Sequence, residues 1–278
     1  MTMKRRYFSI WLGAGIILSV LTATNTIAAE KTGWASSPAN AWLVEKPIPD
    51  KYRSQIKTTP PTSADAHVPG SFLAVNTPAG MERLKRSRFK EDYWTLTVNF
   101  ATQRKQTLCS VATAVTILNS LPLKRPLDLV YKPFPYFTQA NYFNDGVAAI
   151  RSYQHTLTDG MTLEMAGRAM AIHGAMTKPV HASDTSVDEM RIMIRDNLAR
   201  TGDFVAINYQ RKLIGQPKGA HFSPVAAYDE KSDTFLIMDV ARYKFPPVWV
   251  RAEDLYKAMN THDSETPKTR GFILISAS

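Results

Sequence analysis

The only cysteine of the chain stands at the start of a segment that has the spacing of a buried helix. Cys109 is alone among 278 residues, and apolar residues recur after it at helical intervals as far as Leu121. A thiol at the N-terminus of a helix faces free backbone N–H groups and the positive end of the helix dipole, which lower its pKa and favour the nucleophilic thiolate. Because a lone cysteine is more often a small buried apolar residue, other residues must support a reactive role.

A histidine and an aspartate follow much later, in a predicted hairpin. His221 opens an apolar run that ends at Tyr228, and Asp239 closes a second run that begins at Thr234. The polar residues between these runs predict a turn, which would bring His221 and Asp239 to the same end of two paired strands. A cysteine followed by a histidine and then a carboxamide or carboxylate is the chain order of papain-like enzymes.

These residue types can together cleave an amide through a thioester. Cys109 would attack the carbonyl carbon, and His221 would first take the thiol proton and then give it to the departing amine. Asp239 would accept a hydrogen bond from the other imidazole nitrogen and so fix the tautomer. Gln103 and Gln106, just upstream of the thiol, could donate hydrogen bonds to the oxyanion of the tetrahedral intermediate.

The sequence around these residues resembles the phytochelatin synthase family, whose members transfer gamma-glutamylcysteine between glutathione molecules. The resemblance extends from about residue 97 to residue 276. It rests on Gln103, six residues before the cysteine, and on blocks at residues 119–121, 221–224, 239–247, 259–263 and 268–272. It implies an α+β papain-like fold, in which a helical lobe carries the cysteine and an antiparallel sheet lobe carries the histidine and the aspartate.

The same resemblance implies a substrate and its contacts. Glutathione and gamma-glutamylcysteine peptides would be the partners. Asp263 and Arg270 would bind the amino and carboxylate groups of the gamma-glutamyl end, since an arginine fork suits a carboxylate. Arg242, close to Asp239, would either pair with a carboxylate or contact the substrate. No organic cofactor is implied, and cadmium or zinc would enter as thiolate complexes of the substrate.

Some positions depart from the family pattern. Ser110, Ala220, Ala226 and Ala227 stand where the family often has glycine, and the added groups would narrow the acceptor side of the site. The chain ends soon after the matching region, without the cysteine-rich extension of plant and yeast relatives, as do short bacterial relatives that mainly split glutathione. We therefore expect hydrolysis to gamma-glutamylcysteine and glycine to dominate over peptide synthesis.

The first residues have the pattern of a secretory signal peptide. Basic residues 4–6 precede an apolar run from Tyr7 to Leu21 and small residues up to Ala29, near which we expect cleavage of a signal peptide of residues 1–29. The protein would then be secreted, into the periplasm of a Gram-negative cell, and would have no membrane contact. An uncleaved membrane anchor is the alternative, although the apolar run is shorter than the ~20 residues of a membrane span.

Beyond this leader the composition divides the chain. Residues 30–80 are rich in Pro, Ser, Thr and Ala, which predicts an extended arm, and residues 81–278 would form the catalytic domain. Within that domain we expect helices at 163–174, from a capping box at Ser186 and Glu189 to about residue 200, and at 252–260. Strands at 203–209, 248–250 and 271–276 would join the hairpin. Helices first and an antiparallel sheet later predict an α+β fold.

Charge and histidine spacing narrow the partners. The formal net charge of +10 falls to +7 when residues 1–29, with three basic and no acidic side chains, are removed, and such a charge could steer an anionic tripeptide or a nucleic acid. The densest basic cluster, at 83–90, lacks the interleaved aromatic residues of a nucleic-acid platform, so we expect no nucleic-acid partner. The histidines, at 67, 155, 173, 181, 221 and 262, form no metal-binding pattern, and we expect no metal site.

Two alternative functions stay open at this point. The same three residues could act on another peptide or on a peptidoglycan stem, in which case substitution of Asp263 or Arg270 would have no effect. The chain could also be an inactive periplasmic protein that binds glutathione and forms no thioester. The sequence does not decide whether the protein is a homodimer.

Overall fold

The computed structural model describes residues 72–217 and 219–277, which are built around one antiparallel sheet. Neighbouring strands follow the order β1, β6, β5, β4, β3, β7 and β2. The strands are β1 (Phe72–Ala74), β2 (Ala175–His181), β3 (Phe204–Gln210), β4 (Ala220–Asp229), β5 (Thr234–Ile237), β6 (Val248–Arg251) and β7 (Gly271–Ala277). The helices are α2 (Pro78–Arg86), α3 (Glu91–Val98), α4 (Cys109–Ser120), α5 (Asp145–Ile150), α6 (Tyr153–Asp159), α7 (Leu163–Ile172), α8 (Val187–Leu198) and α9 (Ala252–Met259).

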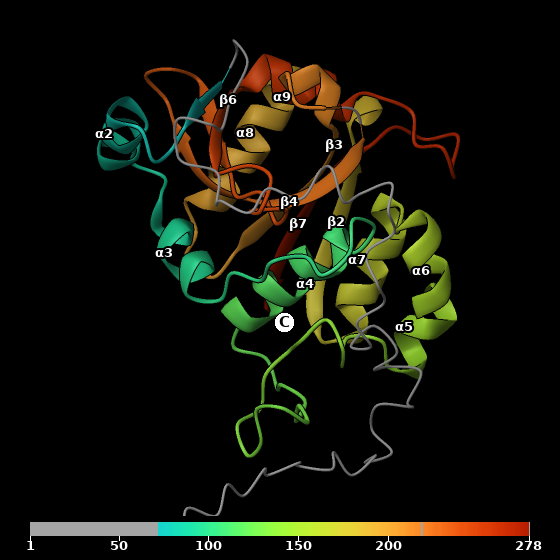
Figure 1. Cartoon of the computed structure of the whole chain (residues 1–278). Helices are drawn as coiled ribbons and strands as arrows, with labels where there is room; N and C mark the ends of the chain where they lie inside the picture. The colour runs from blue at the N-terminus through green and yellow to red at the C-terminus, as the bar shows by residue number, and fades with distance from the viewer. Residues whose placement is uncertain (1–71, 218, 278) are drawn as a thin grey trace, which may run out of the picture. The chain divides into compact units, whose positions relative to one another are not determined.

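The sheet is covered by helices on both faces. Figure 1 shows α4 and α7 on one side of the sheet and α8 and α9 on the other. Side chains alternate between the two cores along each strand, as the pleat requires. In β3, for example, Phe204 and Ala206 join the core with α4 and α7, whereas Val205 and Ile207 join the core with α8 and α9. The predicted α+β class with a papain-like layout is confirmed.

Helix α4 carries the cysteine and lies deep in the structure. Residues 109–119 are all buried, because the helix packs against β4, α3 and α7. The helix contains no charged residue, which is the composition expected of a helix enclosed on all sides. Cys109 is its first residue, as predicted, and Leu121 leaves the helix in extended conformation before Pro122.

Most elements predicted in the second half of the chain are confirmed. Strands β4 and β5 form the predicted hairpin, and β3, β6, α9 and β7 lie within about two residues of their predicted bounds. The capping box at the start of α8 is present, since Ser186 Oγ accepts from the backbone N–H of Glu189 while the Glu189 carboxylate accepts from the backbone N–H of Ser186. Local hydrogen bonding therefore sets where this helix begins.

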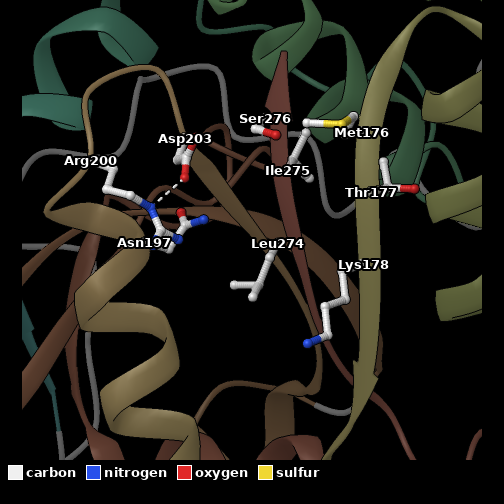
Figure 2. A pocket seen from close by; sticks show the side chains of 9 residues that line it. All are labelled: Met176, Thr177, Lys178, Asn197, Arg200, Asp203, Leu274, Ile275 and Ser276. Atoms are coloured by element: carbon white, nitrogen blue, oxygen red, sulfur yellow. Dashed lines mark hydrogen bonds and ion pairs between the residues drawn. The ribbon is translucent and has the colours of Figure 1, made fainter. Parts of the chain in front are cut away.

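Two strands, β1 and β2, were not predicted. Strand β2 pairs with β7 along its whole length as an edge of the sheet. It contains Lys178 and Pro179, which break the alternation of apolar residues and which an edge position tolerates. Figure 2 shows this edge, where a hollow between β2, β7 and the end of α8 contains none of the predicted site residues.

The N-terminal boundary of the domain also differs from the prediction. Strand β1 pairs with β6, and α2 begins at Pro78, with Thr77 as its N-cap. Residues 72–80 therefore belong with the sheet, although 30–80 were predicted to form an extended arm. The prediction failed here because the strand is short and its surroundings are rich in turn formers. The rest of the arm and the signal peptide at residues 1–29 lie outside the described residues. Across the described residues, no helix has both the length and the apolar character to span a bilayer.

Candidate active site

The structure brings Cys109, His221 and Asp239 together. Cys109 opens α4, His221 is near the start of β4, and Asp239 follows the end of β5. The Cys109 thiol and His221 share a side-chain hydrogen bond. Nε2 of His221 lies 2.9 Å from Asp239 Oδ1, so Nδ1 is the nitrogen left for the thiol. The three side chains thus form a continuous chain from sulfur to carboxylate.

The charges of this chain support each other. Burial raises the pKa of the Cys109 thiol, but the hydrogen bond and charge of His221, with backbone hydrogen bonds at Phe222 and Ser110, outweigh it and leave the pKa below its usual value. Burial lowers the pKa of His221, but hydrogen bonds and charge interactions with Asp239 and Cys109 outweigh it and leave that pKa raised. The two shifts together favour a thiolate and imidazolium pair.

Asp239 is held by an arginine that the sequence did not single out. Arg211 Nη1 and Nη2 donate to Asp239 Oδ2 and Oδ1 at 2.5 Å and 2.8 Å, and the backbone N–H of Ala241 donates to Oδ1 at 2.8 Å. Burial alone would raise the pKa of Asp239, but His221 and Arg211 hold it well below its usual range. The carboxylate therefore stays ionised and fixed in place.

The sequence feature that could have identified Arg211 as a site residue is its position directly after β3. That strand pairs with β4 so that Gln210 lies opposite Ala220, next to His221. The register also places Tyr209 opposite His221, so Arg211 follows two residues later. The sequence alone did not give this register. The Arg211 guanidinium also lies over the Phe245 ring, 4.9 Å from its centroid.

Gln103 lies beside the site and is buried. Its backbone N–H donates to Val240 O at 2.9 Å, and its Nε2 donates to the hydroxyl of Tyr243 at 2.9 Å. Among the described residues, Gln103 Oε1 is buried with no partner. A half-turn of the amide would let Tyr243 donate to Oε1 and would place the amide N–H groups at the position where Oε1 has no partner.

Two pockets meet at His221. The first, about 130 Å³, contains Cys109 and also Asp159, Asn208, Asp263, Glu265 and Arg270; we call it the thiol pocket. The second, about 300 Å³, contains Gln103, Arg211, Lys244 and Phe245; we call it the basic pocket. Gln106, Ala220 and His221 line both. His221 therefore borders both pockets, although its side chain is only 3% exposed.

Asp263 and Arg270 both lie in the thiol pocket with Cys109. Arg270 is buried, and its Nη1 is anchored by Thr261 Oγ1 at 3.1 Å and by the carbonyl of His262. Its Nε is buried with no partner among the described residues, and burial lowers its pKa while Asp263 partly offsets this. A carboxylate and an anchored guanidinium in one pocket suit a zwitterionic amino acid end.

Other residues of interest fall in different places. Arg242 is not brought to the site: it is exposed, and its guanidinium lies 5.4 Å from the centroid of Phe100. Of the positions where glycine was expected, Ala220 lines both pockets, whereas Ala226 and Ala227 are part of the core. Asn208, which was not predicted, lines the thiol pocket, and its Oδ1 has no partner among the described residues.

Comparison with known proteins identifies the family. The model of the phytochelatin synthase family matches residues 63–272. The chain is 31% identical over 212 residues to glutathione gamma-glutamylcysteinyltransferase of Schizosaccharomyces pombe, which covers 75% of this chain and 50% of that protein. It is 30% identical over 186 residues to glutathione gamma-glutamylcysteinyltransferase 1 of Lotus japonicus, which covers 67% of this chain and 36% of that protein. The chain thus spans half or less of these curated relatives. It belongs to the phytochelatin synthase family.

Proposed function

We propose that the protein cleaves the Cys–Gly bond of glutathione through a gamma-glutamylcysteinyl thioester on Cys109. The observation that carries this proposal is the chain of Cys109, His221 and Asp239, which opens into a pocket with Asp263 and Arg270. The names of the relatives, glutathione gamma-glutamylcysteinyltransferases, support the same substrate.

The first half of the reaction forms the thioester. The Cys109 thiolate attacks the carbonyl carbon of the Cys–Gly bond, and the oxyanion is stabilised by backbone N–H groups at the start of α4 and by the amide of Gln103. The His221 imidazolium gives its proton to the nitrogen of the departing glycine. The C–N bond breaks, glycine leaves, and the acyl group stays on sulfur.

The second half releases the acyl group. His221, now neutral, takes a proton from water or from the amine of a second glutathione, which attacks the thioester carbonyl. The Cys109 thiolate leaves, and the pair with the imidazolium is restored. We propose that water is the main acceptor, so hydrolysis exceeds peptide synthesis. Ala220 supports this choice because it lines both pockets at a position where the family often has glycine, and its side chain would narrow the space for a large acceptor.

The two charged groups at the gamma-glutamyl end of the substrate would be bound by opposite charges. Asp263 would bind the ammonium and Arg270 the α-carboxylate of the gamma-glutamyl end, since both face the thiol pocket. We propose that cadmium or zinc reaches this site only as a thiolate complex of the substrate, without a resident cofactor. Among the described residues, no three His, Cys, Asp or Glu side chains are grouped as metal ligands.

We also propose that the protein is exported by a signal peptide at residues 1–29 and works in the periplasm. The support is the order of basic, apolar and small residues in that segment. N-terminal sequencing of the protein purified from the periplasm of a Gram-negative host should begin close to residue 30. An intact N-terminus in the membrane fraction would instead support an anchor.

Replacement of the nucleophile gives the direct test. The Cys109→Ala variant should lose glycine release by a factor of about 10⁴ or more, because no other group can form the thioester. Mass spectrometry of the acid-quenched wild-type reaction should show one gamma-glutamylcysteinyl group on Cys109. Persistent glycine release by the variant would refute the mechanism, and cleavage of alpha-linked peptides in preference to glutathione would favour a general peptidase.

A further inference from the structure

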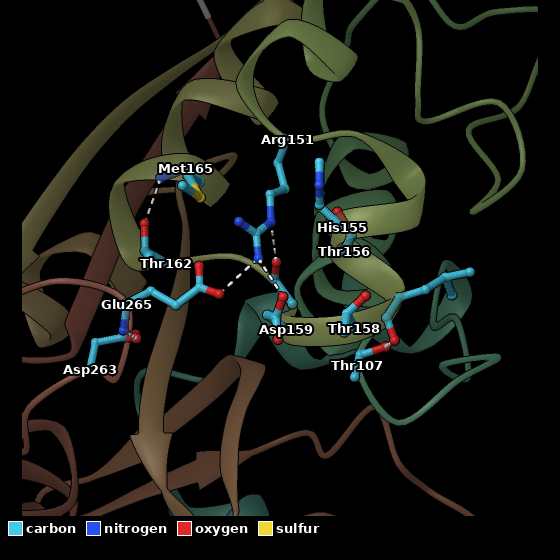
Figure 3. A network of polar contacts seen from close by, with 12 residues as sticks. Thr107, Arg151, His155, Thr156, Thr158, Asp159, Thr162, Met165, Asp263 and Glu265 are labelled. Carbon is cyan, nitrogen blue, oxygen red and sulfur yellow. Dashed lines mark hydrogen bonds and ion pairs between the residues drawn. The ribbon is translucent and has the colours of Figure 1, made fainter.

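One arginine connects two walls of the thiol pocket. Arg151 lies between α5 and α6, and its side chain is 15% exposed. Its Nη2 donates to Glu265 Oε1 at 2.8 Å and lies 3.3 Å from Asp159 Oδ2, while its Nε donates to Gly160 O at 3.2 Å. Figure 3 shows the Arg151 guanidinium between the side chains of Asp159 and Glu265. Asp159, Gly160 and Glu265 all line the thiol pocket, although Arg151 does not.

The contact continues to a residue proposed to bind substrate. The backbone N–H of Glu265 donates to Asp263 Oδ1 at 3.1 Å. Arg151 thus fixes the side chain of Glu265, and the backbone of Glu265 fixes one oxygen of Asp263. The second oxygen of Asp263 then has a defined direction in the pocket. The two walls are far apart in sequence, and this ion pair connects them directly.

The distribution of charge in the thiol pocket supports the same role for Arg151. Three carboxylates, from Asp159, Asp263 and Glu265, line the thiol pocket. Arg151 pairs with two of them, Asp159 and Glu265. Of the three, Asp263 is then the one without an Arg151 contact. Asp263 also interacts with the Arg270 charge but, within the described part of the chain, forms no ion pair with it, so we expect a substrate ammonium to be directed to Asp263 and not to either neighbour.

We propose that Arg151 is a positioning residue, which clamps Glu265 against Gly160 and thereby presents Asp263 to the α-ammonium group of the substrate. The inference rests on the proposed function, because it deepens the account of the same pocket. It assigns to Arg151 selectivity for a free α-amino group and no contact with the reacting atoms.

The kinetic test compares two substrates. The Arg151→Gln variant should raise KM for glutathione about tenfold and change kcat less than about twofold, since uniform binding is lost and chemistry is not. N-acetylglutathione has no ammonium for Asp263 to bind, so its KM should change little. The preference for glutathione over N-acetylglutathione should therefore fall by about tenfold. An unchanged preference in the folded variant would overturn the proposal, because a general loss of structure would affect both substrates.

A double-mutant cycle tests the route through Glu265. Glu265→Gln alone should raise KM for glutathione by about fivefold, and the double variant should be no worse than Arg151→Gln, because one contact is removed in all three proteins. If the effects of the two substitutions on KM were additive, the proposed contact of Arg151 with Glu265 would not explain them, and the proposal would be refuted. Hydrogen exchange of the backbone around residue 264 should be faster in both single variants, and unchanged exchange would equally contradict it.

A matched control is available elsewhere in the chain. Arg191 also bridges two carboxylates, Asp188 and Asp233, and belongs to neither pocket at His221. Arg191→Gln should leave the substrate preference unchanged. If the wild-type protein released no glycine from glutathione, the proposed function would fail, and hydrogen exchange would still decide whether Arg151 holds the loop. Glycine release with unaltered Arg151→Gln kinetics would overturn this inference alone.

Discussion

The thiol pocket and the basic pocket share the imidazole of His221 but differ in charge. The thiol pocket combines three carboxylates with Arg270, whereas the charged residues of the basic pocket beside the imidazole are Arg211 and Lys244. The first arrangement suits a group that carries both an ammonium and a carboxylate, and the second suits a group whose nearest charge is a carboxylate. On the proposed function, we expect the acyl group to occupy the thiol pocket and its exchange partners to approach through the basic pocket.

The largest expected effect comes from the group that the pockets share. At pH 6 the His221→Gln variant should be alkylated by iodoacetamide at Cys109 about a hundredfold more slowly than the wild type, because the thiol loses the partner that lowers its pKa while it stays buried.

The dependence of activity and of alkylation on pH should show the directions in which the pKa values of Cys109 and His221 are shifted. The wild-type thiolate forms as pH rises through the lowered pKa of Cys109, and the imidazolium is lost as pH rises through the raised pKa of His221. Activity should therefore be highest between these two values. The midpoint of alkylation should lie below the usual thiol pKa and rise in His221→Gln, and equal midpoints in the two proteins would contradict the ion pair.

A smaller effect should be confined to the thiol pocket. Arg270→Lys keeps the charge but loses the fork, so KM for glutathione should rise about thirtyfold with a smaller change in kcat. The ratio of hydrolysis to peptide synthesis should stay the same, because acceptors approach from the other side. A change in that ratio, with an unaltered KM, would contradict the assignment of the two pockets.

A substitution in the basic pocket should instead change the ratio of peptide synthesis to hydrolysis. Lys244→Met removes a cation whose pKa is lowered by burial and by the neighbouring Arg211. Peptide synthesis at high glutathione concentration should fall about threefold relative to hydrolysis, because a cation that is only partly shielded from solvent contributes modestly. Chromatography of thiol peptides and free glycine measures this ratio. An identical profile for Lys244→Met and Arg270→Lys would remove the distinction between the pockets.

The smallest effect on activity is expected from a buried carboxyl outside both pockets. Burial raises the pKa of Asp92 to about 8, and Asp203 and Glu91 contribute; its Oδ2 has no partner among the described residues. The folded protein then keeps a proton that the unfolded chain releases at lower pH, so stability falls as pH rises from about 4 to about 8. Asp92→Asn should raise Tm at pH 8 by about 5 °C and leave KM unchanged. A Tm that is unaffected at pH 8 and at pH 5 would contradict the buried proton.

Sequence reasoning identified the residues whose roles follow from local pattern. Cys109 was found from its place at the head of an apolar helix, and His221 and Asp239 from a hairpin, because periodicity and turn composition are written in adjacent residues. Arg211 and Arg151 were not found. Each acts on a residue distant in the chain, and only the pairing of β3 with β4 and the meeting of two loops reveal their partners.

The two clear errors have the same physical origin. Strand β2 is an edge strand with a proline, so it lacks the apolar alternation that marks a strand with two covered faces. Strand β1 is so short that no pattern can develop. Both are stabilised by pairing with a neighbour, and such long-range pairing cannot be deduced from a short segment of sequence.

The double hydrogen bond from Arg211 to Asp239 limits how far a catalytic proton can travel. Because the guanidinium keeps that carboxylate charged, the imidazole has no onward acceptor, and the proton can move only among sulfur, nitrogen and the incoming or departing group. In each turnover one proton leaves the imidazole with the departing glycine, and a proton from water or from the acceptor amine replaces it. Solvent can exchange that proton only when one of the two pockets stands open, so occupancy of the pockets, and not the acidity of Asp239, would govern its exchange.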